Sequence, residues 1–189
     1  MIKRIFLPLI LLLPMLVLAD SIRVRPLEWA QPMIGTELDN FYRLNDQVYR
    51  SQQPDDEEME ALESMGMRSI LNLREYHTDD DEAEGTKLNL FHIPIDAGKI
   101  DDEFVIKALR TINQAEKPVL IHCWHGSDRT GVVSAMYRMV FEGWPREQAI
   151  DEFLHGGYGY HARFYPNIER YLETVEIAAI RRQVLQHKE

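Results

Sequence analysis

The 189-residue sequence contains a single cysteine, Cys123. A chain with one thiol cannot form an internal disulfide bond, so packing and hydrogen bonds must hold its fold together. Basic residues are also scarce, with 21 Lys and Arg against 31 Asp and Glu and a formal net charge of −10. Because nucleic-acid binding depends on neutralising phosphates with basic side chains, this composition argues against a nucleic-acid partner.

The N-terminal apolar run is too short to cross a membrane as a helix. It extends from Ile5 to Leu18, about 14 residues, where a bilayer requires roughly 20. Two basic residues precede it and the small residue Ala19 follows it, which is the pattern of a secretory signal peptide. The sequence therefore predicts a signal peptide over residues 1–19, export to the periplasm, and a single domain over residues 20–189 without stable membrane insertion. An uncleaved anchor is the alternative.

Segments with strand and helix periodicity alternate along the rest of the chain. The apolar patterns predict strands within residues 41–49, 68–73, 88–95 and 119–122. They predict helices over residues 55–65, 102–115, 130–142, 146–154 and 166–186. Alternation of this kind predicts an α/β fold, with a sheet covered by helices on both faces.

The lone cysteine lies in a short turn between a predicted strand and a predicted helix. The turn reads His-Cys-Trp-His-Gly-Ser-Asp-Arg-Thr-Gly over residues 122–131. Backbone N–H groups at the start of a helix lack intrahelical partners, and the helix dipole favours negative charge there. Such a place binds phosphate, and a cysteine within it is expected to react as the thiolate.

This turn resembles the signature of the protein tyrosine phosphatase superfamily, in which His-Cys is followed by five residues, Arg and Ser or Thr. The match covers His122, Cys123, Arg129 and Thr130. The resemblance extends over most of the chain and is to the dual-specificity type, with stretches at residues 48–54 and 135–138 similar to those of bacterial exported members. It implies a small, mostly parallel central sheet flanked by helices, and chemistry that needs no cofactor or metal.

Two other interpretations of the cysteine remain open. It could be a buried structural thiol, although such a residue needs no glycine or arginine beside it. It could also bind a metal together with His122 and His125, although a zinc site usually has four ligands and more cysteines.

The resemblance assigns a role to each residue of the turn. Cys123 is the nucleophile, Arg129 holds two phosphoryl oxygens, and the Thr130 hydroxyl donates to the thiolate, although helix capping would also explain a threonine there. His122 orients the turn. Phosphate is expected to be bound by the turn residues Trp124, His125, Gly126, Ser127, Asp128 and Arg129.

Family members take their general acid from an aspartate on a loop that follows the preceding strand. In this sequence Asp96 follows Phe91–Ile95 and is the first candidate, with Gly98 allowing the loop to move. Asp101 and Asp102 are the alternatives, although both are well placed to start a helix.

Two acidic features have open interpretations. Asp128 is next to Arg129, and its carboxylate is expected to point away from the phosphate. The alternative is that Asp128 indicates an inositol phosphate or phosphoinositide substrate. The acidic stretch over residues 77–85 is expected to be solvated surface, and a cation-binding loop is the alternative.

The expected partner is a phosphotyrosine protein, and in dual-specificity members also a phosphoserine or phosphothreonine protein. A module that binds phosphorylated ligands without turnover is the non-enzymatic alternative.

Overall fold

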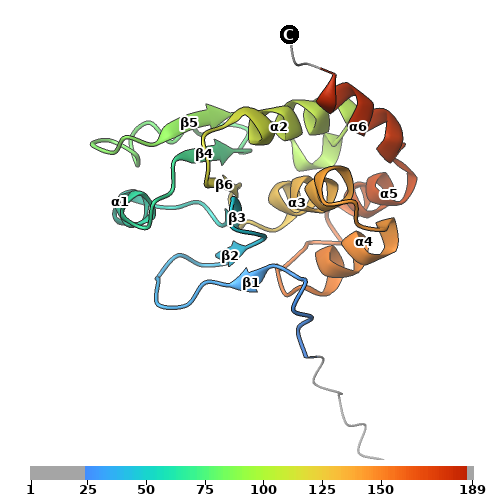
Figure 1. The fold of residues 1–189 in the computed structure, drawn as a ribbon, viewed down its shortest axis with the longest axis horizontal. Coiled ribbons are helices and arrows are strands. Elements are labelled where there is room, and N and C mark those ends of the chain that lie inside the picture. Colours follow the sequence, from blue (N-terminus) through green and yellow to red (C-terminus); the bar gives the residue numbers. More distant parts are fainter. Residues whose placement is uncertain (1–23, 187–189) are drawn as a thin grey trace, which may run out of the picture.

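The computed structural model describes residues 24–186, so the predicted signal peptide lies outside the described residues. Its sheet has six strands in the order β1-β2-β3-β6-β4-β5 (Figure 1). Strands β3, β6, β4 and β5 are parallel, and β1 and β2 form an antiparallel edge. The strand bounds are Gln31–Pro32 (β1), Tyr42–Arg43 (β2), Val48–Ser51 (β3), Ser69–Asn72 (β4), Asn89–His92 (β5) and Val119–His122 (β6).

Helices cover both faces of the sheet, as the sequence predicted. Figure 1 shows α1 on one side and α2 to α6 on the other. The helix bounds are Asp56–Ser64 (α1), Asp102–Gln114 (α2), Asp128–Phe141 (α3), Arg146–His155 (α4), Pro166–Thr174 (α5) and Ile177–Leu185 (α6), with a short 3₁₀ helix, η1, at Ala97–Lys99.

The central strands alternate between two apolar layers because successive side chains of a strand point to opposite faces. In β6, Leu120 packs into the layer beneath α1, whereas Ile121 packs into the larger layer with α2 and α3. Ile70 and Leu71 of β4 divide in the same way. All four side chains are fully buried, which fixes the register of the strands that end at the cysteine.

Two predicted elements are divided in the structure. The predicted strand at residues 41–49 consists of β2 and β3 separated by a turn, in which the Asn45 side chain accepts the N–H groups of Gln47 and Val48. The predicted final helix consists of α5 and α6. The Arg146 guanidinium donates to the carbonyls of Leu172 and Val175 at the end of α5. In a continuous helix, backbone N–H groups of the next turn would bond these carbonyls instead.

The cysteine-containing turn lies at the carboxyl ends of the parallel strands. His122, the last residue of β6, is aligned with Ser51 of β3 on one side and Asn72 of β4 on the other. The turn leads directly into α3, which begins at Asp128, two residues earlier than predicted. Within residues 24–186, no helix is long and apolar enough to cross a membrane.

Candidate active site

The turn after β6 is tightly fitted against the end of β3 through Gly126. This glycine has a φ of +70°, a conformation that side chains disfavour. A Cβ atom at this position would lie 2.3 Å from the Ser51 carbonyl oxygen. The buried Arg50 guanidinium donates to the Gly126 carbonyl from below. Only glycine therefore allows the turn to close over the strand end.

Cys123 is buried at the base of the turn, with 2% of its surface exposed. The preceding His122 is fully buried, and its Nε2 lies 2.8 Å from Oδ2 of Asp79. Its Nδ1 lies 3.3 Å from the Cys123 carbonyl oxygen. The Asp79–His122 pair thus fixes the backbone at the cysteine from beneath.

Asp79 corrects the expectation that residues 77–85 form only solvated surface. Its side chain is buried and accepts hydrogen bonds from Asn72 at 2.8 Å and Gln53 at 3.0 Å, besides its contact with His122. Burial by itself raises the pKa of Asp79, but the hydrogen bond and charge of His122 outweigh it, and the pKa is lowered. The sequence could not reveal this role of Asp79, because its partner His122 is 43 positions away along the chain.

Arg129 lies in the first turn of α3, at the rim of the site. Its Nη1 makes long contacts of 3.4 Å with the Leu73 carbonyl and 3.3 Å with the Ile95 carbonyl, beyond the ends of β4 and β5. Its Nε is buried and has no hydrogen-bond partner within residues 24–186. A buried donor without a partner is costly, so the guanidinium is arranged to receive an anion.

Thr130 is fully buried in the first turn of α3. It does not cap this helix, because the N-cap position is Ser127, whose side chain makes no capping bond. The Thr130 hydroxyl has no hydrogen-bond partner among the described residues. The capping explanation for Thr130 is therefore wrong, and its hydroxyl is free for another donor role.

Asp96 caps η1 in this structure. Its side chain accepts the Gly98 N–H at 2.8 Å and lies 3.2 Å from the Lys99 ammonium. These two contacts, with the charge of Arg129, lower the pKa of Asp96. Because the neighbouring Ile95 carbonyl contacts Arg129, the Asp96 loop lies against the site.

The two alternative acids have structural partners at the start of α2. Asp101 caps the helix by accepting the Phe104 N–H at 2.9 Å. Asp102 accepts the Tyr171 hydroxyl at 2.9 Å, which joins α2 to α5. The local geometry explains both residues without a catalytic role.

Asp128 points to another loop. It is buried, and its carboxylate accepts the His161 backbone N–H at 2.9 Å and lies 2.8 Å from His161 Nδ1. The exposed His125 ring lies 5.3 Å from the His161 ring. The side chains around this contact line a surface pocket of about 420 Å³, formed by Trp124, His125, Asp128, Arg129, His161, Phe164 and Tyr165.

Several contacts that stabilise the turn come from residues the motif does not contain. Asn40, with a φ of +52°, donates its amide to the carbonyls of His125 and Tyr158. The Ser127 hydroxyl donates to the same Tyr158 carbonyl at 2.6 Å. The Arg50 guanidinium stacks on the Tyr158 ring at 3.7 Å. The glycine-rich loop at residues 156–160 therefore supports the cysteine-containing turn.

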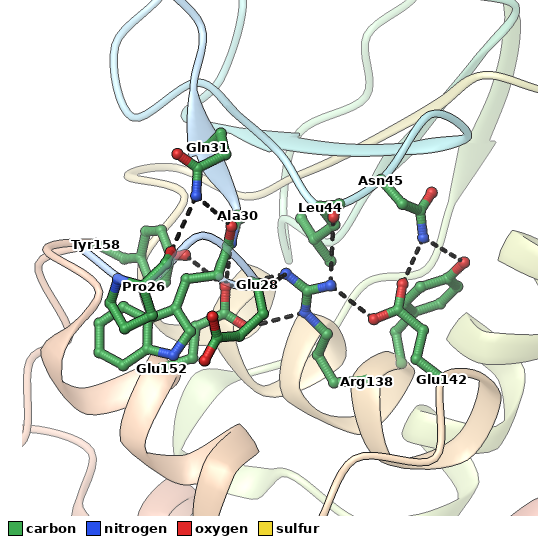
Figure 2. Close-up of polar contacts among 12 residues, drawn as sticks. Pro26, Glu28, Ala30, Gln31, Leu44, Asn45, Arg138, Glu142, Glu152 and Tyr158 are labelled. Carbon is green, nitrogen blue, oxygen red and sulfur yellow. Dashed lines mark hydrogen bonds and ion pairs between the residues drawn. The ribbon is translucent and has the colours of Figure 1, made fainter.

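A buried ionic network connects this support to α3 and the N-terminal segment (Figure 2). Glu152 lies 2.9 Å from Arg138 Nε and accepts hydrogen bonds from the Ala30 N–H at 2.6 Å and the Tyr158 hydroxyl at 2.9 Å. Arg138 also pairs with Glu142 at 2.6 Å. The pairing of Arg138 with Glu152 could not be predicted from the sequence, because Glu152 lies 14 residues away on another helix.

The residues do not support a metal site at the cysteine. Among the described residues, His122, Cys123 and His125 do not form a group close enough to hold an ion. His122 instead faces Asp79, and His125 is exposed.

A mostly parallel sheet flanked by helices, with a cysteine and an arginine in the turn after its central strand, defines the class of cysteine-dependent phosphatases. This chain has that fold. The sequence pattern described as "Tyrosine phosphatase family" matches residues 36–185. The chain therefore belongs to the tyrosine phosphatase family.

Two kinds of curated relative are similar in sequence. The dual specificity protein phosphatase TpbA of Pseudomonas aeruginosa is 34% identical over 145 residues, which cover 75% of this chain and 64% of TpbA. The inositol diphosphatase DSP2 of Oryza sativa subsp. japonica is 35% identical over 127 residues, 61% of each chain. This chain thus spans less than two thirds of the length of these relatives.

Solved structures of TpbA and of the inositol diphosphatase SIW14 are similar to this chain in fold. The crystal structure of P. aeruginosa TpbA superposes with a TM-score of 0.77 at 29% identity, covering 85% of this chain and 99% of that one. A TpbA variant in complex with pTyr gives 0.76 at 28% identity, covering 85% and 98%. The catalytic domain of the PP-IP phosphatase SIW14 from Saccharomyces cerevisiae gives 0.62 at 25% identity, covering 80% and 91%.

Proposed function

We propose that this protein is an exported phosphatase that hydrolyses phosphomonoesters on tyrosine, and on serine or threonine, through a phosphocysteine intermediate. One observation carries the proposal: Cys123 lies buried beneath a turn whose Arg129 has a buried Nε without a partner in the described residues. The similarity to TpbA, a dual specificity protein phosphatase with a structure in complex with pTyr, supports this substrate class.

In the first step the Cys123 thiolate attacks phosphorus and the bond to the ester oxygen breaks. The backbone N–H groups of residues 124–129 and the Arg129 guanidinium hold the three remaining oxygens, over which the charge of the transition state is spread. Asp96 gives its proton to the departing oxygen. In the second step water attacks the phosphocysteine, Asp96 takes a proton from that water, and the thiolate leaves with a hydrogen bond from Thr130.

This role requires Asp96 to change its contacts. In the present conformation the Gly98 N–H and Lys99 favour the carboxylate form, and its pKa is lowered. An acid must carry a proton at the start of the first step. We infer that the side chain leaves Gly98 and Lys99 when substrate binds, because a phosphate dianion nearby raises the proton affinity of a carboxyl group.

An inositol phosphate or phosphoinositide phosphatase is the second candidate. The specific observation in its favour is the similarity to several inositol diphosphatases, including DSP2 and the solved SIW14 domain. The formal net charge of −10 favours the protein substrate, because an acidic protein repels a highly phosphorylated ring.

Phosphate release from three substrates tests the proposal. A phosphotyrosine peptide, a phosphoserine peptide and an inositol pyrophosphate are assayed with reductant and chelator present. We expect turnover of the phosphotyrosine peptide that is lost in Cys123→Ser and restored by neither metal nor cofactor. Faster turnover of the inositol pyrophosphate would favour the second candidate. Binding of phosphopeptide by wild type without phosphate release would favour a non-catalytic binding module.

Export is the remaining part of the proposal and rests on the N-terminal sequence pattern. Expression of the full chain in a Gram-negative host, followed by N-terminal sequencing of the periplasmic protein, tests it. We expect Asp20 as the first residue. A protein that begins at Met1 and fractionates with membranes would contradict cleavage.

A further inference from the structure

A second cluster of ionisable side chains lies in the segment that connects β4 to β5. His77, Asp79 and Glu82 each offer one nitrogen or oxygen atom, and these three atoms lie within 4.8 Å of one another. His77 Nε2 and Glu82 Oε1 are 2.8 Å apart. Their side chains are 32% and 21% exposed, whereas that of Asp79 is 2% exposed. The cluster is thus open to solvent on one side and has a buried carboxylate at its base.

Two features of the carboxylates point to a cation. Glu82 Oε2 is buried and has no hydrogen-bond partner in the described part of the chain. Asp79 Oδ2 contacts His122 Nε2. Carboxylates that bind metals are commonly oriented by such a hydrogen bond from a second residue. The site therefore offers both an unused acceptor and an oriented one.

The surrounding charges favour a cation as well. The same loop carries the acidic residues Asp80, Asp81 and Glu84 and no Lys or Arg between residues 77 and 85. Arg74 is the cation that interacts electrostatically with both Asp79 and Glu82. Its guanidinium stacks on the Trp124 ring at 4.1 Å, and among residues 24–186 no ion pair joins it to either carboxylate.

We propose that His77, Asp79 and Glu82 form a binding site for a divalent transition metal, with Zn²⁺ as the ion that suits the donors best. One imidazole and two carboxylates leave a fourth position for water in a tetrahedral site. Three ligands are too few for Ca²⁺, which takes six or more oxygens. The three ligands lie outside the turn that contains Cys123 and Arg129.

The site is connected to that turn through a shared carboxylate. Asp79 contacts His122, and His122 precedes the nucleophile. Because thiolates in general bind zinc, inhibition of the wild-type enzyme by zinc would not distinguish binding at Cys123 from binding at the proposed site. The test therefore uses Cys123→Ser, which removes the only thiol in the chain.

The experiment is a calorimetric titration of the full-length Cys123→Ser protein with ZnCl₂, after removal of any affinity tag. We expect one ion per chain, and Co²⁺ in its place should give the intense visible absorption of a four-coordinate complex. Adding His77→Ala or Glu82→Gln should weaken Zn²⁺ binding at least about tenfold. Zinc should also raise the melting temperature of Cys123→Ser, and of neither double variant.

Matched substitutions provide the controls. His155→Ala removes an exposed histidine on α4, and Glu84→Gln removes a carboxylate of the same loop. Both should keep the zinc affinity of the Cys123→Ser parent. Melting in chelator establishes that each variant is folded, and if His77→Ala is not, Glu82→Gln decides. Absence of zinc binding by Cys123→Ser, or equal affinity in all variants, would overturn the proposal.

Discussion

The Asp79 carboxylate lies 2.8 Å from His122 Nε2, and both side chains are buried beneath the cysteine that follows His122. This contact joins the loop after β4 to the end of β6. In the proposed mechanism it makes Asp79 a positioning residue, since Asp79 reaches Cys123 only through His122 and the backbone.

Replacing Asp79 by alanine should destabilise the protein and slow its reaction. The change leaves the buried His122 and Asn72 without their acceptor, which costs about 2–4 kcal/mol. Urea unfolding measures the loss of stability, and kcat should fall at least about tenfold. Asp80→Ala, an exposed neighbour, serves as the control. Unchanged stability in Asp79→Ala would show that the contact is weak in solution.

The lowered pKa of Asp79 also predicts how stability depends on pH. The folded protein binds the Asp79 proton less readily than the unfolded chain, whose aspartates have a pKa of about 3.9. The resulting stabilisation is fully present above that pH and is lost as the pH falls through the lower, folded value. The free energy of unfolding of Asp79→Asn should therefore fall less steeply below about pH 4 than that of wild type.

Gly126→Ala should prevent the phosphate-binding turn from closing. The added Cβ would lie 2.3 Å from the Ser51 carbonyl oxygen, in a backbone with positive φ. We expect a loss of at least about 3 kcal/mol, a fall in melting temperature of about 6–12 °C, and loss of activity. Gly143→Ala is the matched control, with a φ of +73° but no atom within 4 Å of the new Cβ. It should cost only about 1–2 kcal/mol.

Asp96→Asn should affect substrates according to their leaving groups. A general acid matters most when the departing oxygen is strongly basic, so turnover of phosphotyrosine should fall about 100-fold. Turnover of an aryl phosphate with an acidic phenol should fall much less. Asp102→Asn, which changes the partner of Tyr171, should show no such difference. An equal loss on both substrates in Asp96→Asn would contradict its role as the acid.

Glu152→Gln should destabilise the fold more than Glu142→Gln, although both residues pair with Arg138. The Glu152 side chain is 7% exposed and that of Glu142 is 21% exposed. Removing the Glu152 charge leaves the buried Arg138 with Glu142 as its remaining ion-pair partner, which costs about 3 kcal/mol. The more exposed pair is worth about 1 kcal/mol or less. Urea denaturation of the two variants tests this order, and equal losses would contradict it.

The sequence predicts most of the elements because their causes are local. Asp55 and Glu58 form a reciprocal capping box that starts α1 where the acidic pattern indicated. The apolar stripe of α2 and the buried run of β6 are equally local signals. Division of the final helix could not be predicted in this way, because Arg146 on α4 satisfies the carbonyls at the end of α5.

The sequence alone determined which groups the proposed chemistry uses, since Cys123, Arg129 and Thr130 lie within one short turn and their spacing is covalently fixed. Tertiary structure decided what holds that turn in place. Asp79, Arg50 and Asn40 reach it from other parts of the chain. Partners that are far apart in sequence leave no periodic signal, and only the packing of the sheet and its loops brings their charges and carbonyls within hydrogen-bonding distance.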